Sequence, residues 1–216
     1  TLSAEAINRR YERMSNPVAA IFKREWKLLL RTPVYMLNGL AGTIMGPLIA
    51  AMIFAAQGQT GEMKELFAFL NMPEYTTIVT LAGLGFMLFT AGMNVAASTA
   101  LSREGKAFWI AKIIPVPAWR QVLGKLLQGF SISLIGSVIT GIILVVFLKF
   151  SLLRVIIIFI IAVFGSVLLT SLNLIIDVFH PKLVWNSPQE AMKQNMNSLF
   201  GMLASFAIIG ILVAIS

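Results

Sequence analysis

The sequence predicts an all-α protein whose helices form a polytopic membrane bundle. Hydrophobic residues make up 58% of the 216 residues and charged residues 12%, against roughly 45–50% and about 25% in soluble domains. A crossing takes about 20 apolar residues, and lipid-exposed backbone must bond to itself, which favours helices. Asp, Glu, Lys, Arg and His are absent from five long runs, and we therefore expect five transmembrane helices, at residues 36–56, 76–101, 126–148, 155–176 and 198–216.

The segment ahead of the first run predicts an amphipathic helix at residues 17–31. Asn16 suits an N-cap, and Pro17 suits the first helical position. Apolar residues recur there at helical spacing, and most basic residues take the other face. Such helices lie in the membrane interface. We expect residues 1–35 to form a cytoplasmic, interfacial segment with this elbow helix, and 36–216 the transmembrane domain. The helix is either a simple anchor or also a contact for a cytoplasmic partner.

Basic residues are concentrated on one side of the expected bundle. Seven precede the first run, five lie between the second and third, and two lie between the fourth and fifth, against three on the other side. Short loops rich in Lys and Arg stay in the cytoplasm, which predicts a multi-pass protein of the cell membrane with a cytoplasmic amino terminus. The formal net charge of +8 then matches the anionic inner leaflet of the lipid bilayer, and no nucleic acid is needed to explain it.

Three connecting segments have patterns of their own. Apolar residues between Met63 and Leu70 repeat at i, i+3, i+4 and i+7, which predicts a short surface helix. The link at residues 149–154 is too short for a domain and predicts a tight antiparallel hairpin. Ser187–Glu190 has the capping-box pattern with proline at the first helical position. We expect it to begin a long helix that continues into the fifth run.

Residues 102–125 form the longest cytoplasmic loop of this arrangement. Pro115 and Pro117 disfavour helix just before them, which predicts a short helix over 103–114 and a second helix from about Ala118 into the third run. The alternative is an interfacial helix held by tryptophan side chains at the lipid headgroups. The residues of this loop that we expect to contact a soluble partner are Arg103, Glu104, Gly105, Lys106, Phe108, Trp109 and Lys112.

Small residues recur at a spacing of four in two of the expected spans. On one stripe of a helix they let backbones approach closely, which is how membrane helices pack. The stripes belong either to packing within one bundle, or to a subunit interface or translocation path. The candidate packing residues are Gly42 and Gly46 in the first span and Gly129, Ser133, Ser137 and Gly141 in the third.

Several kinds of chemistry lack the residues they need. The five runs hold no ionisable side chain of the kind that proton-coupled transporters place within the membrane. Neither Gly105-Lys106 nor Gly124-Lys125 has the spacing of a phosphate-binding P-loop, so we expect no ATP hydrolysis by this chain. The chain has no cysteine, and we expect neither a metal nor a cofactor. Asp177, His180 and Glu190 could supply an acid–base pair or metal ligands, so a membrane enzyme stays open as an alternative.

A set of short motifs carries a family resemblance. Arg103-Glu104-Gly105 is followed by Pro115-Val116-Pro117, and Gly124-Lys125 opens a span. The amphipathic helix precedes the first span, and a block from Pro181 to Trp185 precedes Glu190, Lys193, Gln194 and Asn195. With these motifs the chain resembles the permease subunit of ABC-2 type transporters over nearly its whole length, and it is most similar to bacterial ABC exporter permeases.

The resemblance implies a six-helix transmembrane domain that pairs with a second such domain and with an ATP-binding cassette ATPase subunit, where ATP and magnesium would bind. It implies that the loop at 102–125 contains the coupling helix. The sixth helix and the outer re-entrant segment before it are absent here, so we expect an incomplete domain from a longer protein. Lys106 stands where many members have threonine. The expected function is a permease subunit of an ATP-driven exporter, and a non-transporting anchor or sensor is the other alternative.

Overall fold

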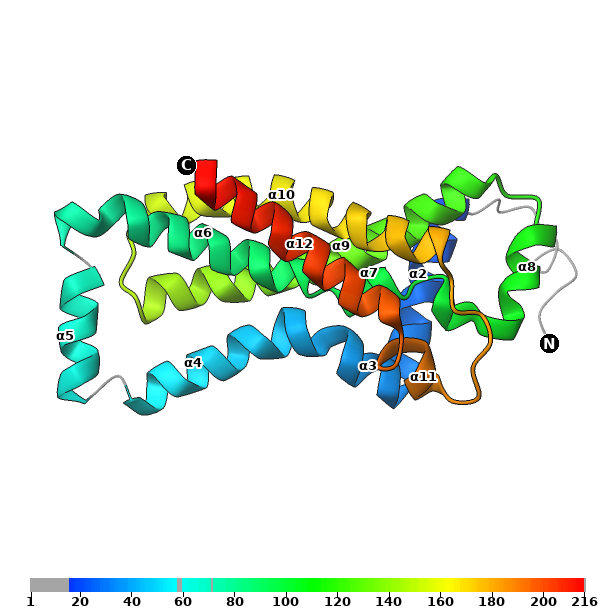
Figure 1. The fold of residues 1–216 in the computed structure, drawn as a ribbon, viewed down its shortest axis with the longest axis horizontal. Helices are drawn as coiled ribbons and strands as arrows, with labels where there is room; N and C mark the ends of the chain where they lie inside the picture. The colour runs from blue at the N-terminus through cyan, green and yellow to red at the C-terminus, as the bar shows by residue number, and fades with distance from the viewer. Residues whose placement is uncertain (1–15, 58–59, 71, 216) are drawn as a thin grey trace, which may run out of the picture.

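The computed structural model describes residues 16–57, 60–70 and 72–215, which form helices with short connections (Figure 1). Residues 1–15 of the predicted amino-terminal segment lie outside this part, as does residue 216. In chain order the elements are α2 (Pro17–Arg31), α3 (Pro33–Leu40), the π-helix η1 (Ala41–Met45), α4 (Gly46–Gln57), α5 (Gly61–Leu70), the 3-10 turn η2 (Pro73–Tyr75), α6 (Thr76–Gly92), α7 (Val95–Ser98), the 3-10 turn η3 (Ser102–Ala107), α8 (Phe108–Ile113), α9 (Ala118–Val146), α10 (Leu152–Phe179), α11 (Pro188–Met192) and α12 (Met196–Ile215).

Four helical segments of the described residues are long and apolar enough to cross a membrane, as expected for a multi-pass membrane protein. They contain the first, second and fourth predicted runs, and the third run up to Val146. The fifth run forms α12, a helix of 20 residues that is not among the four. Its crossing of the membrane stays a prediction, as does the interfacial position of α2. The four segments are Pro33–Gln57, Pro73–Ile113, Ala118–Val146 and Leu152–Phe179.

Helix α10 packs against α6, α9 and α12 and joins them into one bundle (Figure 1). Its buried residues Ile158 and Leu169 form an apolar core with Met87 of α6 in the half of the bundle near α5. The opposite side of α10 exposes large apolar side chains, among them Phe164 at 74%. A broad exposed apolar surface of this kind is typical of a membrane contact.

Helix α2 packs along the first half of α9 at the other end of the bundle. The side chain of Asn16 caps its first turn, so the helix has the predicted bounds. Leu29 of α2 and Ile132 of α9 belong to a second buried core. Gly124 of α9 makes the close approach possible, because a Cβ there would lie 2.7 Å from the side chain of Ile21.

The first predicted span is interrupted by η1 (Ala41–Met45), which is π-helical. Pro47 has no amide hydrogen for the carbonyl four residues earlier, that of Thr43, and proline inside a helix disrupts the regular pattern. The Thr43 carbonyl instead lies against Gly136 of α9, where an added Cβ would lie 2.3 Å from it. The wider turn changes which residues face inward, so Pro47 is buried and Gly46 has no other helix in close contact. The packing role of Gly46 therefore stays a prediction that no close helix contact within the described residues supports.

The small residues of the third span lie on the buried side of α9. A Cβ added at Gly129 would lie 3.1 Å from Thr170 of α10, and the Ser133 hydroxyl lies 3.2 Å from the Thr170 hydroxyl. Ser137 and Gly141 are buried on the same helix. These close contacts lie within the chain, which supports packing within one bundle as the role of this stripe.

The second predicted run, 76–101, is a regular helix only as far as Gly92, where α6 ends. Asn94 caps the short α7 with its side-chain oxygen and donates from its amide to the Gly129 carbonyl at 2.7 Å. Asn173 of α10 donates to the Gly92 carbonyl at 3.3 Å. Side-chain hydrogen bonds here replace backbone hydrogen bonds that a regular helix would have made. The prediction of one helix to residue 101 is wrong, because Asn94 supports a break inside the run.

Two of the predicted connections are confirmed. Helices α9 and α10 form a tight hairpin, in which Lys149 has a left-handed backbone with φ of 57°. The Ser151 side chain caps α10 by accepting the Arg154 amide at 3.4 Å. The predicted surface helix between Met63 and Leu70 is α5.

The predicted helix from Ser187 into the fifth run is wrong. Glu190 accepts the amide of Asn186 at 3.1 Å, whereas the Ser187 side chain makes no cap hydrogen bond. Helix α11 ends after five residues. Asn195 then accepts the amide of Asn197 at 3.0 Å, which starts α12 as a separate helix. A polar side chain that competes for backbone groups ends one helix and begins the next.

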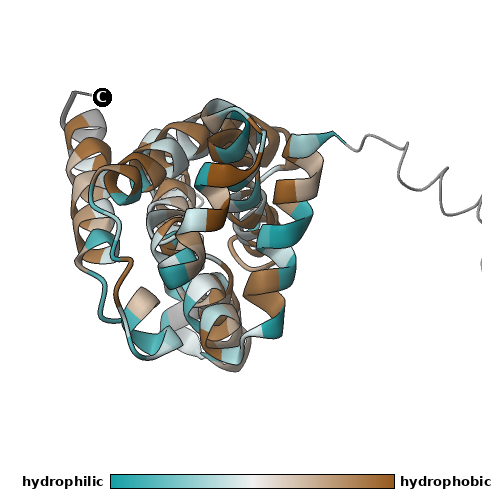
Figure 2. Ribbon diagram, turned by 90° about the vertical axis from the view of Figure 1, so that its right-hand side faces the viewer, coloured by the Kyte–Doolittle hydropathy of each residue, from teal (hydrophilic) through white to brown (hydrophobic). Residues whose placement is uncertain are grey.

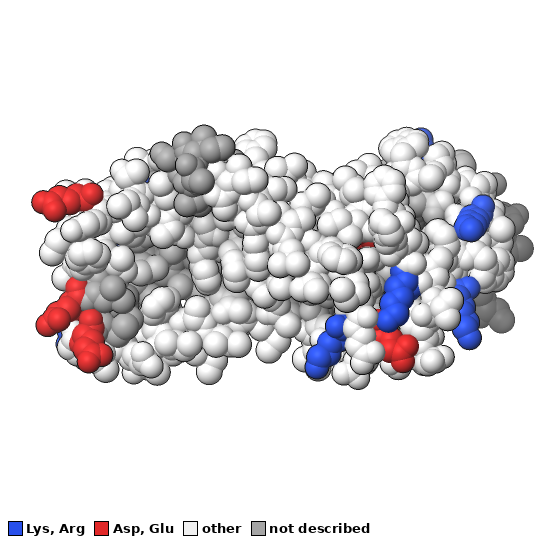
Figure 3. Space-filling view, in the orientation of Figure 1, with Lys and Arg blue, Asp and Glu red and all other residues white. Residues whose placement is uncertain are grey.

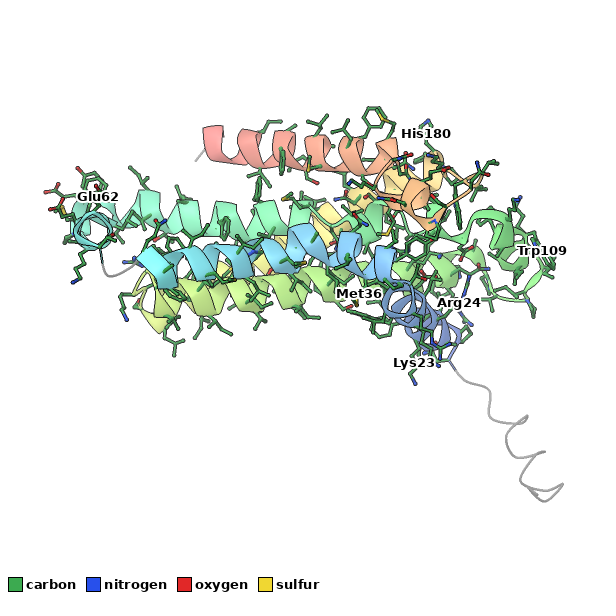
Figure 4. All side chains as sticks on the ribbon, turned by 90° about the horizontal axis from the view of Figure 1, so that it is seen from below. Lys23, Arg24, Met36, Glu62, Trp109 and His180 are labelled. Carbon is green, nitrogen blue, oxygen red and sulfur yellow. The ribbon has the colours of Figure 1, made fainter. Side chains whose placement is uncertain are left out.

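Charged side chains gather at the two ends of the bundle. Acidic residues of α5 and η2 mark one end, the other end holds most basic residues together with further acidic ones, and the middle of the face in Figure 3 carries no charge. Figure 2 looks at the basic end, where hydrophilic positions lie on the near turns. In Figure 4, Glu62 marks the acidic end and Trp109 the opposite one. The uncharged belt between the ends matches a bundle whose long axis crosses the membrane.

Candidate functional site

The η3 turn contains the Arg-Glu-Gly motif and is buried against the bundle. Arg103 and Glu104 have exposed fractions of only 2% and 6%. Both belong to a set of five charged side chains that we call the buried ion cluster. Its members are Arg24 and Glu25 of α2, Arg103 and Glu104 of η3, and Lys125 of α9.

Lys125 lies at the centre of the buried ion cluster. Its Nζ is 2.8 Å from Glu25 Oε1 and 2.8 Å from Glu104 Oε1. The same nitrogen donates to the Ala100 carbonyl at 3.0 Å. One ammonium group therefore joins α2, α9 and the chain just before η3.

Arg103 and Arg24 extend the cluster to either side. Arg103 Nη2 lies 3.3 Å from Glu25 Oε2, and its Nη1 donates to the Ala96 carbonyl at 2.7 Å. Arg24, which is partly exposed at the rim, lies 3.1 Å from Glu104 Oε1. The three cations outnumber the two carboxylates, so the cluster carries a net positive charge.

The pKa of Glu25 depends on the other charges of the buried ion cluster. Burial by itself would raise the pKa of Glu25, but the positive charges of Lys125, Arg103 and Arg24 outweigh it and hold that pKa below its ordinary value. A buried ion pair adds little net stability, whereas loss of one partner costs about 3–5 kcal/mol because it leaves a buried charge uncompensated. The main effect of the cluster is therefore to fix the position of η3. Its net contribution to the overall stability of the fold is smaller.

A second network holds the start of η3 to the end of α10. Asp177 Oδ2 accepts the amides of Leu101 at 2.6 Å and Ser102 at 3.1 Å, and its Oδ1 accepts the Ser102 hydroxyl. Asn197 donates to the same carboxylate at 2.9 Å and to the His180 carbonyl at 2.6 Å. Asp177 thus connects η3, α10 and the start of α12.

Gly105 is required by its backbone and by its neighbour. Its φ of 51° is one that residues with a side chain rarely adopt. A Cβ at this position would lie 2.6 Å from the Trp185 ring. The Trp185 indole donates to the Ser102 carbonyl at 2.9 Å, so the ring lies across the turn and covers it.

Helix α8 follows directly and is exposed. Trp109 and Ile113 have exposed fractions of 59% and 67%, and Lys112 lies on the same short helix with its Nζ 5.2 Å from the centre of the Phe108 ring. A run of apolar side chains with a nearby cation at the basic end of the molecule (Figure 4) is suited to contact with another protein.

A groove of about 490 Å³ separates α8 from α9. Its walls are mostly apolar, with Phe108 and Ile114 on one side and Val122 on the other, and Glu104 and Lys125 also line it. The Gln121 side chain spans the link between the two helices by donating to the carbonyls of Ala111 and Val116, both at 2.9 Å. Force applied to α8 would therefore reach α9 through these bonds as well as through η3.

The predicted contact residues divide into two groups. Arg103, Glu104 and Gly105 are buried within the chain, and this burial gives no support to the expectation that the first two pair with a partner protein. The predicted helix over 103–114 is corrected, because the left-handed backbone of Gly105 separates η3 from α8. The residues that remain available are the exposed Lys106, Trp109 and Lys112 and the half-buried Phe108.

The three residues of the enzyme alternative do not come together. Asp177 is buried in its hydrogen bonds, His180 is exposed, and Glu190 accepts the Asn186 amide. No group of three Asp, Glu, His or Cys side chains among the described residues could hold a metal ion. The geometry therefore gives the enzyme hypothesis no support.

The structure adds residues that the sequence interpretation missed. Glu25 had a visible signal, because it lies one turn from both Ile21 and Leu29 and so interrupts the apolar side of α2. Ser102 and Asn197 had no such signal in the sequence, because their common partner Asp177 is not a neighbour of either residue along the chain.

No protein-family model, curated protein or solved structure matches the chain. The arrangement itself shows what the site can do. A rigidly held turn carries an exposed helix at the basic end of a membrane bundle, and covalent and hydrogen-bonded links run from it into α2, α9, α10 and α12. This geometry can pass movement from a bound protein to the spanning helices.

Proposed function

We propose that the chain is a transmembrane permease subunit of an ATP-driven, ABC-2 type exporter, with α8 as its coupling helix. The observation that carries the proposal is the contrast between η3 and α8. The turn is fixed by five charged side chains and by Asp177, whereas the next helix leaves Trp109 and Ile113 exposed. Of the motifs that resemble the family's first cytoplasmic loop, Arg103-Glu104-Gly105 lies in η3, Pro115-Val116-Pro117 follows α8, and Gly124-Lys125 lies in α9.

In this mechanism ATP binding and hydrolysis occur in a separate ATP-binding cassette subunit. The apolar side chains of α8 would seat on that subunit, with Lys106 and Lys112 beside them. Movement of α8 would pass through η3 to Lys125 on α9 and to Asp177 on α10. Because both are held by short hydrogen bonds, the helices would move as rigid bodies and change the side to which the path opens.

The proposal includes an orientation and further partners. The basic end, with α2 and α8, faces the cytoplasm, and the α5 end faces outward, in agreement with the positive-inside rule. Helix α2 lies as an elbow helix in the interface, with the exposed Lys23 and Lys27 toward anionic lipid. A second transmembrane domain completes the transporter.

The test is co-purification of the full-length protein from its native membrane. We expect a P-loop ATPase to co-purify and its activity to rise with the permease bound. The double substitution Trp109→Ala and Ile113→Ala should abolish both effects while the protein still folds, because both side chains are exposed. Phe164→Ala, another exposed aromatic within α10, is the matched control. Absence of any P-loop ATPase, with the protein intact, would favour the anchor or sensor hypothesis.

A further inference from the structure

The interruptions of the first two spans meet at one place in the bundle. The π-helical turn η1 contains Gly42, and the break between α6 and α7 contains Met93. A Cβ added at Gly42 would lie 2.8 Å from Met93 Cβ and 2.9 Å from the Met93 carbonyl oxygen. The two irregular segments are therefore in direct contact.

Irregular backbone within a membrane protein needs compensation, and polar side chains supply it here. Asn173 donates to the Gly92 carbonyl, and the Asn94 side-chain oxygen accepts the Ala97 amide. Helices that face lipid avoid such breaks. Breaks occur where the backbone is buried in protein or lines a water-filled cavity. Interrupted helices that meet inside a bundle often surround the site of a transported molecule.

A cavity of about 270 Å³ lies at this meeting point. That volume is close to the lower limit for ligand pockets, about 300 Å³. Met93, Met192 and Met202 are among its lining residues, and flexible methionine side chains adapt to apolar ligands of varied shape. Polar groups come from asparagine and serine side chains, and among the described lining residues only the exposed Lys193 is charged. The lining residues used here are Asn38, Met93, Val95, Lys193, Ser198 and Met202.

We propose that this cavity is a water-accessible ligand site that takes a small acidic amphiphile. The acidic group would lie at Lys193 and Asn38, and the apolar part against Met93 and Met202. No carboxylate of the described residues lines the cavity, so a cation would find no opposite charge among them. The proposal deepens the proposed function by naming a class of cargo. Only the interpretation of the bound ligand as transported cargo rests on that function.

The absence of cysteine from the native sequence allows a direct test of access. Val95→Cys and Ser198→Cys place single thiols in the cavity, and Phe164→Cys places one on the exposed side of α10 as a control. In native membranes we expect an anionic, water-soluble thiosulfonate to label both cavity thiols and to leave the control unlabelled, because thiols react as thiolates and these form in water.

The charge of Lys193 should set the preference between reagents. We expect the anionic thiosulfonate to react about tenfold faster than a cationic one, the scale of one fixed charge several ångströms away in a protein. Lys193→Glu should reverse that order. Because Lys193 is exposed, this substitution leaves folding intact. Equal rates for both reagents, or no labelling at either cavity thiol, would overturn the proposal.

A second measurement needs no cysteine variant. In nanodiscs, decanoate should raise the unfolding temperature of the natural protein, and decyltrimethylammonium should not. Lys193→Ala should remove the effect of decanoate. An equal response to both amphiphiles would overturn the proposal. If a P-loop ATPase co-purifies but these tests fail, the inference is wrong and the permease stands. If the tests succeed without an ATPase, the permease proposal fails and the site stands.

Discussion

The η3 turn and helix α8 are adjacent in the chain and opposite in character. The turn buries two charged side chains and bonds them to α2 and α9, and Asp177 accepts its first amides. Helix α8 exposes Trp109 and Ile113 and keeps its cation beside them. One loop therefore combines two roles, because η3 fixes a position and α8 offers a surface.

The difference also separates stability from partner binding. Changes in η3 and its partners should unfold or loosen the protein before any partner is involved. Changes in α8 should leave the isolated protein unaltered and act only when a partner is present. Four substitutions or conditions test this division, from the largest expected effect on stability to the smallest.

Glu25→Gln should have the largest effect. It removes the carboxylate shared by Lys125 and Arg103, and we expect a loss of about 3–5 kcal/mol in the free energy of unfolding, because buried charges lose their partner. Thermal unfolding in detergent measures it. Glu62→Gln, an exposed carboxylate at the other end, should change little, and an equal loss in both variants would contradict a special role for the cluster.

Gly105→Ala should have the next largest effect. Gly105 has φ of 51° and ψ of −128°, a sparsely populated region that costs a residue with a side chain about 1–3 kcal/mol, and the new Cβ would lie 2.6 Å from the Trp185 ring. We expect lower thermal stability together with a change in Trp185 fluorescence. Gly61→Ala, where an added Cβ meets no atom within 4 Å, is the control. Unchanged fluorescence and stability would mean that the turn tolerates a side chain.

Acidic pH should weaken the buried ion cluster and so lower the stability of the protein. The pKa of Glu25 in the folded protein lies below its ordinary value, so its contribution is complete above about pH 4.3, the value for an unfolded glutamate. That contribution falls as the pH drops through the lower, folded pKa, because protonation removes the charge that Lys125 and Arg103 need. Unfolding temperatures measured from pH 3 to 7 should fall less steeply for Glu25→Gln than for the natural protein. Parallel curves would contradict this.

The double substitution in α8, Trp109→Ala with Ile113→Ala, should have the smallest effect on stability. Exposed substitutions usually change the free energy of unfolding by no more than about 0.5 kcal/mol. Thermal unfolding of the isolated protein should therefore match that of the natural chain. A large loss would mean that α8 is part of the folded core, and the contrast with η3 would disappear.

Much of the fold could be predicted from charge and apolar length. The bounds of α2 followed from Asn16 and Pro17. Helix α10 contains the predicted fourth run, and α9 contains the third run up to Val146. The helix breaks were harder, because an apolar run has the same composition whether or not it is interrupted. Pro47 and Asn94 were the local signs, since one lacks a donor and the other competes for backbone bonds.

The candidate site was predicted only in part. The loop itself was recognised, and the exposure of Trp109 and Lys112 agrees with the expectation. The burial of Arg103 and Glu104 could not be read locally, because their partners come from residue 25 and residue 125. Charged residues in a loop are ordinarily exposed to water. Arg103 and Glu104 are buried only because α2 packs beside α9 in the folded chain.

The most direct test of the central claim is site-specific photo-crosslinking in native membranes, with the photoreactive residue placed at Ile113 of α8. The account predicts a covalent adduct between position 113 and an ATP-binding cassette ATPase, and no such adduct from position 164 on the lipid-facing side of α10. An absence of the ATPase from the adducts at position 113, or equal adducts at both positions, would contradict it.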